Sequence, residues 1–143
     1  MSQFKGSSYA EALTELHKVC FSNPWSLENF QQILSLPTTF GLGDHTGFIL
    51  CSDLGDTLEI LTLAVHPDYR RQGVASHLLK SLQDFAHQQG HQKIFLEVNV
   101  TNTPAINLYL KNGFKQIGRR KDYYHKQGKS FDALCFAWQK PQQ

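Results

Sequence analysis

The 143-residue chain lacks a large net charge and a long apolar segment. With 14 Lys and Arg against 12 Asp and Glu, its formal charge of +2 is too small to indicate a nucleic-acid partner. No apolar run approaches the length that spans a bilayer, so we expect no membrane partner. Residues 1–5 lack the apolar core of a signal peptide, and the cytoplasm is the expected location.

Cysteine and histidine are too few or too scattered to predict disulfides or a metal site. The three cysteines, Cys20, Cys51 and Cys135, form no Cys-x-x-Cys pair and stand in apolar stretches, so each is expected to be a small core residue. His87 and His91 are four positions apart, but no third ligand is nearby, so no metal is expected. The remaining composition, 41% hydrophobic and 18% charged, is typical of a soluble globular protein.

Length and hydrophobic periodicity predict a single α/β domain over residues 1–143. Helices are expected over residues 8–20, from a Ser26 cap to about residue 34, over 72–89, and from an Asn102 or Thr103 cap to Gly113. Strands are expected over 38–42, 46–51, 57–65, 93–100, 114–124 and 130–138, the first three as an antiparallel meander. A Rossmann-like fold is disfavoured, because repeated strand-helix-strand units are lacking. The nucleotide patterns Gly-x-Gly-x-x-Gly and Gly-x-x-x-x-Gly-Lys-Ser/Thr are lacking as well.

A glycine-containing loop joins the apolar strand 57–65 to the amphipathic helix 72–89. Gly73 allows a ligand to approach the backbone, and the first helical turn offers unpaired N–H groups at the positive end of the helix dipole. This arrangement binds phosphate. Taken alone, the Arg-x-x-Gly-x-Ala hexamer of residues 70–75 also fits an ordinary strand-to-helix turn.

Two side chains further along the chain can transfer protons. Glu97 lies in the strand 93–100, which has apolar residues on both faces and is therefore expected to be central. A carboxylate beside the core is a candidate general base, although a structural ion pair with Arg or Lys explains it equally well. Tyr109 lies in the next helix, where its phenol can donate a proton or simply pack in the core.

In combination and in this order, the motifs resemble the GCN-five-related N-acetyltransferase (GNAT) superfamily over roughly residues 57–125. The acetyl-CoA signature of that family, Gln/Arg-x-x-Gly-x-Gly/Ala, is met by Arg70, Gly73 and Ala75. Within the superfamily the chain is most similar to the bacterial ribosomal-protein-alanine N-acetyltransferases of the RimI type. That similarity rests on the segments 24–26, 96–98, 102–109 and 119–124.

The resemblance implies a fold and a set of site residues. The fold is a central, mixed, mostly antiparallel twisted sheet flanked by about four helices. Glu97 is implied as proton acceptor and Tyr109 as proton donor. Acetyl-CoA contacts are implied for Leu63, Ala64, Val65, Arg70, Arg71, Gln72, Gly73, Val74, Ala75, Ser76 and Asn102. A local splay of the strand ending at Val65 is expected to expose backbone donors to the cosubstrate.

The acceptor is expected to be the N-terminal α-amine of a protein or peptide, with a ribosomal protein as the candidate. A small-molecule amine, a lysine side chain and a non-catalytic acetyl-CoA sensor are the alternatives. Trp25, Tyr123 and Tyr124 are candidate walls of a peptide channel, or ordinary packing aromatics. The amine is expected to attack the thioester directly in a ternary complex, with no metal and no protein thiol. The protein is expected to be a monomer or a weak dimer.

Three features depart from the pattern of the nearest relatives. The first strand of the fold is short or missing in the sequence. Ala75 replaces the commoner Gly, and Asn99 stands where those relatives often carry Arg.

Overall fold

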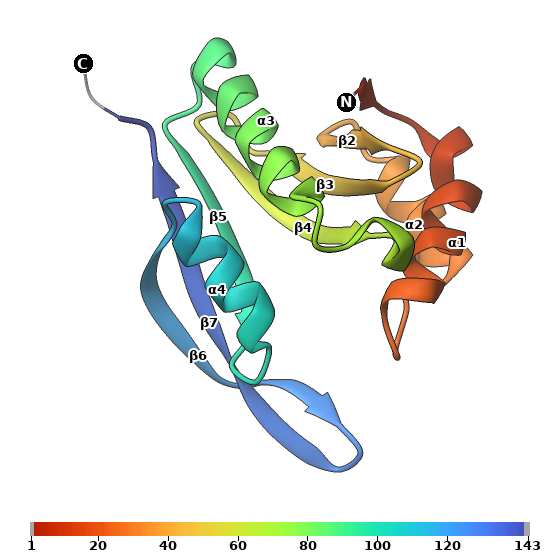
Figure 1. Cartoon of the computed structure of the whole chain (residues 1–143), viewed down its shortest axis with the longest axis vertical. Helices are drawn as coiled ribbons and strands as arrows, with labels where there is room; N and C mark the ends of the chain where they lie inside the picture. The colour runs from red at the N-terminus through yellow and green to blue at the C-terminus, as the bar shows by residue number, and fades with distance from the viewer. Residues whose placement is uncertain (1, 142–143) are drawn as a thin grey trace.

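The computed structural model describes residues 2–141, which form a seven-stranded sheet of order β1-β2-β3-β4-β5-β7-β6 (Figure 1). The strands are β1 (Ser2–Phe4), β2 (Thr39–Asp44), β3 (Gly47–Asp53), β4 (Thr57–Val65), β5 (Lys93–Asn99), β6 (Lys115–Lys126) and β7 (Lys129–Gln139). The helices are α1 (Ala10–Cys20), α2 (Leu27–Leu34), α3 (Val74–Gln89) and α4 (Thr103–Lys111), with short 3-10 turns at Ser7–Tyr9 and Pro67–Tyr69. Only β4 and β5 pair in parallel, which confirms the predicted mixed, mostly antiparallel α/β sheet.

The element boundaries differ from the predicted ones where a side chain or a backbone angle decides them. The helix expected from residue 72 begins at Val74, because Arg71 (φ 63°) and Gly73 (φ 78°) are left-handed and cannot continue a helix. The Asp44 carboxylate accepts from the Thr46 N–H at 2.8 Å and closes a tight turn, which lets β2 extend to Asp44, beyond its predicted end. The Ser26 cap is confirmed, since its Oγ accepts from the Asn29 N–H at 3.1 Å.

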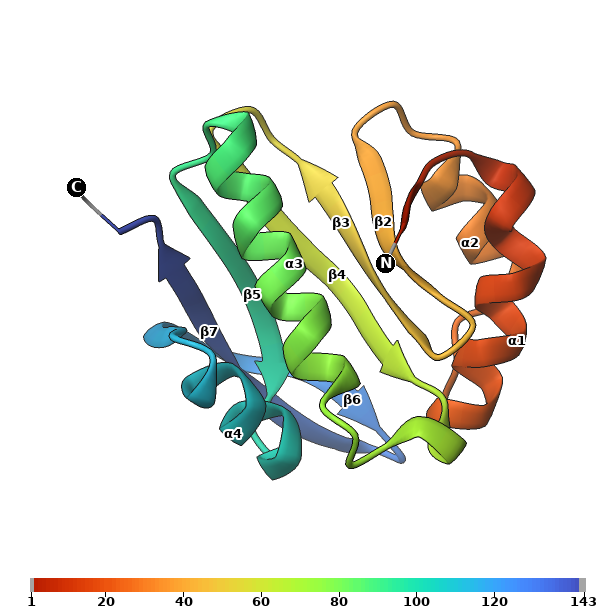
Figure 2. The ribbon, with the colours of Figure 1, turned by 45° about the horizontal axis from the view of Figure 1, so that its top comes forward.

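Two hydrophobic cores cover the two faces of the sheet. Alternation along β3 sends Phe48 and Leu50 to the face under α1 and α2, and Ile49 and Cys51 to the face under α3 and α4. Figure 2 shows α3 lying along its face of the sheet across β3, β4 and β5. Helix α3 buries an apolar stripe there, made of Leu78, Leu79, Leu82 and Ala86. Each buried leucine contributes about 2 kcal/mol, so these contacts hold α3 on the sheet.

Strands β4 and β5 separate part of the way along their length. They pair only from Thr57 to Glu59 on β4, and both views show them diverging like the arms of a V (Figures 1 and 2). A bulge accompanies the separation, because Ile60 pairs with Cys51 and Thr62 with Leu50, so that Leu61 has no partner in β3. Beyond Glu59 the β5 side of β4 has no strand partner in the described residues. The predicted splay of the strand that ends at Val65 is confirmed.

The cysteine prediction is confirmed for Cys51, which is fully buried. Cys20 is partly buried and packs against the core under α1 and α2. The prediction is wrong for Cys135, which is only partly buried because neither α3 nor α4 covers its face of β7. All three are free thiols. Within residues 2–141, no helix is long and apolar enough to cross a membrane.

Candidate functional site

The start of α3 leaves backbone N–H groups open. The first bond within the helix runs from the His77 N–H to the Gly73 carbonyl at 2.9 Å, and no side chain caps the preceding amides. By contrast, α2 is capped by Ser26 and α4 by Asn102, whose Oδ1 accepts from the Ala105 N–H at 3.2 Å. Unpaired amides and the helix dipole make the start of α3 a binding site for an anion.

A cavity of about 210 Å³ opens at this uncapped turn, between the β4–α3 loop and α4. Its lining contains most of the residues predicted to contact the cosubstrate. They are Val65, Arg70, Arg71, Gly73, Val74, Ala75 and Ser76, joined by Tyr69 and Leu108. Leu63 and Ala64 precede them on the arm of β4 that has left β5. The structure thus gathers the lining residues around one opening, whereas Leu63, Ala64, Gln72 and Asn102 are not part of the lining. Contacts of all these residues with acetyl-CoA stay predictions.

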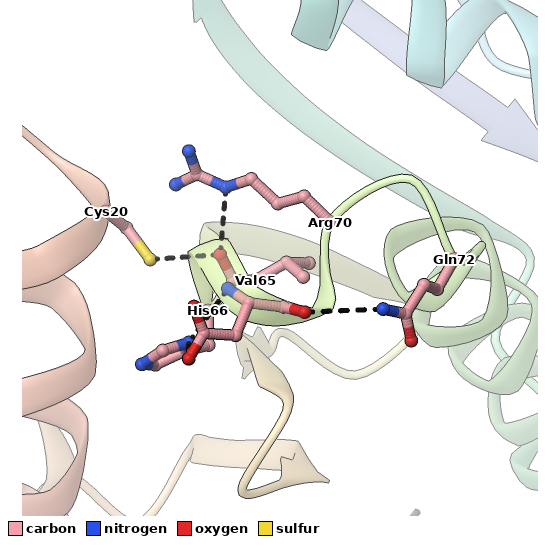
Figure 3. Close-up of polar contacts among 6 residues, drawn as sticks. Cys20, Val65, His66, Arg70 and Gln72 are labelled. Carbon is pink, nitrogen blue, oxygen red and sulfur yellow. Dashed lines mark hydrogen bonds and ion pairs between the residues drawn. The ribbon is translucent and has the colours of Figure 1, made fainter.

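The loop before α3 is stabilised by its own side chains. Figure 3 shows Arg70 reaching toward the Val65 carbonyl, which accepts from Arg70 Nε and from Cys20 Sγ, each at 3.2 Å. Gln72 Nε2 donates to the Asp68 carbonyl at 3.3 Å. The side chains of Arg70 and Gln72 therefore shape the loop, while the open donors at the cavity are backbone amides.

Glu97 forms the structural ion pair that was one of its two predicted roles, and its role as general base stays a prediction. Its Oε1 accepts from Arg120 Nη1 at 2.8 Å, so the structural ion pair exists. Its Oε2 is buried and has no hydrogen-bond partner among the described residues. The side chain is 19% exposed, and leaving a carboxylate oxygen unpaired in such surroundings costs roughly 1–3 kcal/mol. Buried unsatisfied atoms of this kind are typical of functional sites.

A second carboxylate, Glu59, lies beside Glu97 and was missed in the sequence. It ends the paired segment of β4 and points, like Glu97, to the face opposite the core under α3 and α4. Burial and then the negative charge of Glu97 raise the pKa of Glu59. An acidic residue inside the apolar stretch 57–65 was the available signal.

Tyr109 belongs to the core on the face of the sheet under α3 and α4. It is 7% exposed and packs on Phe114 and Phe136, with ring centroids 5.6 and 6.5 Å away. Burial raises the pKa of its phenol, which therefore keeps its proton at neutral pH. Because Leu96 belongs to the same core as Tyr109, the neighbouring Glu97 points to the opposite face of the sheet. The role of Tyr109 as proton donor stays a prediction.

The predicted acceptor-binding aromatics lie on two separate segments. Trp25 packs on Phe30 at 5.2 Å, whereas Tyr123 and Tyr124 pack edge to face at 5.1 Å on the β6–β7 hairpin. In the described residues no ring contact joins the two groups, although Lys126 Nζ donates to Ser22 Oγ at 3.4 Å and links their segments. Tyr124 is half-buried, which raises the pKa of its phenol to about 12. The channel stays a prediction.

A buried histidine, also missed in the sequence, holds Trp25 in place. His17 Nδ1 accepts from the Trp25 backbone N–H at 3.0 Å, so the proton of the neutral ring resides on Nε2. Nε2 lies 3.1 Å from Thr62 Oγ1 on the free arm of β4. Burial lowers the pKa of His17 to about 4. The ring is therefore neutral at physiological pH and serves as a structural link between α1, β4 and the α1–α2 loop.

The described residues contain no group of three or more His, Cys, Asp or Glu side chains that could hold a metal ion. His91, one of the two closely spaced histidines, instead lies 3.0 Å from the Asp53 carboxylate through its Nε2.

Comparisons with known proteins agree with this geometry. Residues 10–114 match the acetyltransferase (GNAT) family. The [ribosomal protein bS18]-alanine N-acetyltransferase of Escherichia coli K12 is 32% identical over 119 residues, 80% of each chain. The N-alpha-acetyltransferase RimI of Mycobacterium tuberculosis is 32% identical over 130 residues, 83% of this chain and 80% of the relative. The crystal structure of the E. coli ribosomal-protein-S18-alanine N-acetyltransferase superposes with a TM-score of 0.87 at 26% identity, covering 99% of this chain and 95% of the other.

The chain belongs to the GNAT family of acetyltransferases. It is an N-acetyltransferase with the GNAT fold, and the cosubstrate of this family is acetyl-CoA. The sequence-based predictions of family, fold class and enzyme class are confirmed.

Proposed function

We propose that this enzyme acetylates the N-terminal α-amine of a protein, with a ribosomal protein as the acceptor. The names of the relatives from E. coli and M. tuberculosis support the α-amine, and the first of them supports a ribosomal-protein alanine. The observation that carries the proposal is the unpaired, buried Oε2 of Glu97, which lies where β5 leaves β4. This oxygen is free to accept the proton of an amine.

In this proposal the β4 arm binds the cosubstrate through its backbone. The open N–H groups of Val74, Ala75 and Ser76 hold the diphosphate of acetyl-CoA at the positive end of α3. The unpaired edge of β4 from Leu63 to Val65 offers backbone groups to the pantetheine amides. The Val65 carbonyl is not among them, because it already accepts from Arg70 and Cys20. A backbone N–H at the same edge is the candidate donor to the thioester oxygen, whose negative charge grows in the transition state.

The proton transfers fall to the two side chains that flank the V. Glu97 accepts a proton from the acceptor amine through a water molecule, and the nitrogen lone pair forms the new bond to the thioester carbon. The carbon–sulfur bond breaks, and Tyr109 donates its proton to the departing thiolate. An α-amine has a pKa of about 8, against about 10.4 for lysine, so it is deprotonated more easily near neutral pH. No protein thiol takes part.

The test is to identify which amine is modified. The protein is incubated with acetyl-CoA and a peptide that begins with alanine and contains an internal lysine. The same peptide with a blocked N-terminus, a polyamine and an aminoglycoside serve as competing acceptors. Mass spectrometry should place one acetyl group on the α-amine of the free peptide alone. Acetylation of the lysine, the polyamine or the aminoglycoside, with the free N-terminus unmodified, would overturn the proposal.

A further inference from the structure

Asn112, the residue that ends α4, connects this helix to the first turn of α3. Its side-chain Nδ2 donates to the Leu108 carbonyl at 2.8 Å and to Ser76 Oγ at 3.2 Å. The backbone carbonyl of Asn112 accepts in turn from Gln83 Nε2 at 2.7 Å, so the position is held from α3 at two points. The bonds to Ser76 and Gln83 join the end of α4 to α3. Within residues 2–141, no other side-chain hydrogen bond joins these two helices.

The orientation of the Asn112 amide follows from its partners. A backbone carbonyl can only accept, so the side-chain atom 2.8 Å from the Leu108 oxygen is the NH₂ group. The second hydrogen of this group is directed at Ser76 Oγ. The oxygen of Ser76 therefore acts as an acceptor toward Asn112, and its own hydroxyl proton is directed elsewhere.

Ser76 lines the cavity at the start of α3, together with Val74 and Ala75. No hydrogen bond donated by the Ser76 hydroxyl is found in the described part of the chain. It is thus an available donor beside the open amides of the same turn. An anion in the cavity would receive a charge-assisted bond from it in addition to the backbone bonds.

We infer that Asn112 is a positioning residue of the acetyl-CoA site, which fixes the Ser76 hydroxyl as a donor to the coenzyme diphosphate. The inference rests on the proposed placement of that diphosphate at α3. Asn112 ends α4, the helix that carries Tyr109. Its contact with Ser76 therefore joins the proposed diphosphate site to the helix that carries the proposed proton donor.

The test compares acetyl-CoA with a cosubstrate that lacks its diphosphate and the nucleotide attached to it. S-acetylpantetheine carries the thioester and the pantetheine arm of acetyl-CoA but no diphosphate. Asn112→Ala and Ser76→Ala should each lower kcat/KM with acetyl-CoA about tenfold, since a hydrogen bond to a charged group contributes at least that factor. With S-acetylpantetheine both variants should stay within about twofold of the unmodified enzyme. Asn112→Ala/Ser76→Ala should be no worse than Ser76→Ala alone, because without the Ser76 hydroxyl there is no donor left for Asn112 to position.

Three further variants make the outcome decisive. Ser76→Thr keeps the hydroxyl and should retain most of the activity with acetyl-CoA. Ser81→Ala, further along α3, is the control, and its kcat/KM should be unchanged with both cosubstrates. If Asn112→Ala does not fold, Ser76→Ala carries the test. Asn112→Asp also loses the bond to the Leu108 carbonyl, but it reverses the polarity of the contact with Ser76. Its carboxylate accepts the Ser76 proton and repels the diphosphate, so the loss with acetyl-CoA should exceed tenfold.

The possible failures are separable. Equal losses with both cosubstrates in Asn112→Ala, or losses that multiply in the double variant, would show a general structural role and overturn the inference. An unchanged ratio of the two kcat/KM values in Ser76→Ala would also overturn it. If the unmodified enzyme itself does not prefer acetyl-CoA to S-acetylpantetheine, the proposed diphosphate site is wrong.

Discussion

The two arms of the V offer different kinds of open groups. On the β4 arm the open groups belong to the backbone, at the uncapped turn of α3 and along the edge that β5 has left, while Arg70 and Gln72 are engaged within the loop. On the β5 arm the strand pairs with β7 over its whole length, and the open atom is the side-chain oxygen Glu97 Oε2. We therefore assign cosubstrate binding to the β4 arm and proton transfer to the β5 arm. Changes on the β4 arm should alter KM for acetyl-CoA, and changes on the β5 arm should alter kcat.

Replacement of Glu97 by Gln is expected to have the largest effect. The amide keeps the shape of the side chain but cannot accept a proton as a base, so kcat should fall by roughly 10²–10⁴ with little change in KM for acetyl-CoA. Steady-state kinetics over a range of pH measure both constants. Asp84→Asn, which removes one exposed carboxylate on α3, is the matched control and should behave like the unmodified enzyme. Wild-type turnover in Glu97→Gln at every pH would remove Glu97 from the mechanism.

Acid should destabilise the protein through His17, which contacts β4. Burial holds the pKa of His17 at about 4 against 6.5, so the folded state stays neutral where the unfolded chain takes up a proton. The free energy of unfolding should therefore fall as pH decreases from 6.5 to about 4, by about 3 kcal/mol from this residue. Urea titrations at several pH values should show a shallower decline in His17→Gln. The same decline in His17→Gln as in the exposed control His87→Gln would contradict the assignment.

Loss of the Tyr109 hydroxyl should affect turnover less than loss of Glu97. In Tyr109→Phe the ring packing remains but the proton donor is gone, so kcat should decrease by about 10–10²-fold. KM for acetyl-CoA should change little, because the ring belongs to the core and not to the diphosphate cavity. If Tyr109→Phe raises only KM and leaves kcat unchanged, Tyr109 contributes to acetyl-CoA binding and not to proton transfer.

A negative charge at the start of α3 should weaken cosubstrate binding. Gly73 is left-handed, and a Cβ atom at this position would have no neighbouring atom within 4 Å, so Gly73→Asn is tolerated sterically and serves as the neutral reference. Relative to it, Gly73→Asp should raise KM for acetyl-CoA about tenfold through repulsion of the diphosphate, with kcat preserved. Equal KM values for Gly73→Asn and Gly73→Asp would mean that no diphosphate binds there.

The smallest effect is expected from the thiols. Cys135 faces Glu97 across the β5–β7 pair, and burial followed by the charge of Glu97 raises its pKa, which disfavours the thiolate. Direct attack of the amine needs no thiol, so Cys20→Ala, Cys51→Ala and Cys135→Ala should retain kcat if folded. Loss of turnover in a folded variant, with an acetylated cysteine detected by mass spectrometry, would indicate a ping-pong route.

The elements of the fold were predictable because their signals are local. Apolar periodicity, the Ser26 and Asn102 caps and the loop glycine at position 73 each act within a few residues. The boundaries at Asp44 and Val74 were missed because a side-chain turn and two left-handed residues set them.

The environment of the site residues could not be predicted in the same way. The partner of Glu97 is Arg120, 23 positions away, and the two meet only through the β5–β7–β6 ladder. Glu59 becomes a neighbour of Glu97 through the single parallel pairing of the sheet. Likewise the contact between Asn112 and Ser76 spans 36 positions. The burial of Cys135 depends on which face of β7 the helices cover, and the local sequence does not specify this.

Backbone amide shifts give the most direct test of where the cosubstrate binds. Titration of the ¹⁵N-labelled protein with coenzyme A should shift the amide signals of Val74, Ala75 and Ser76 most strongly, with smaller shifts along Leu63 to Val65. Titration with pantetheine should leave the three α3 signals in place. Unchanged signals at the start of α3 under saturating coenzyme A would contradict the assignment of the diphosphate to this turn.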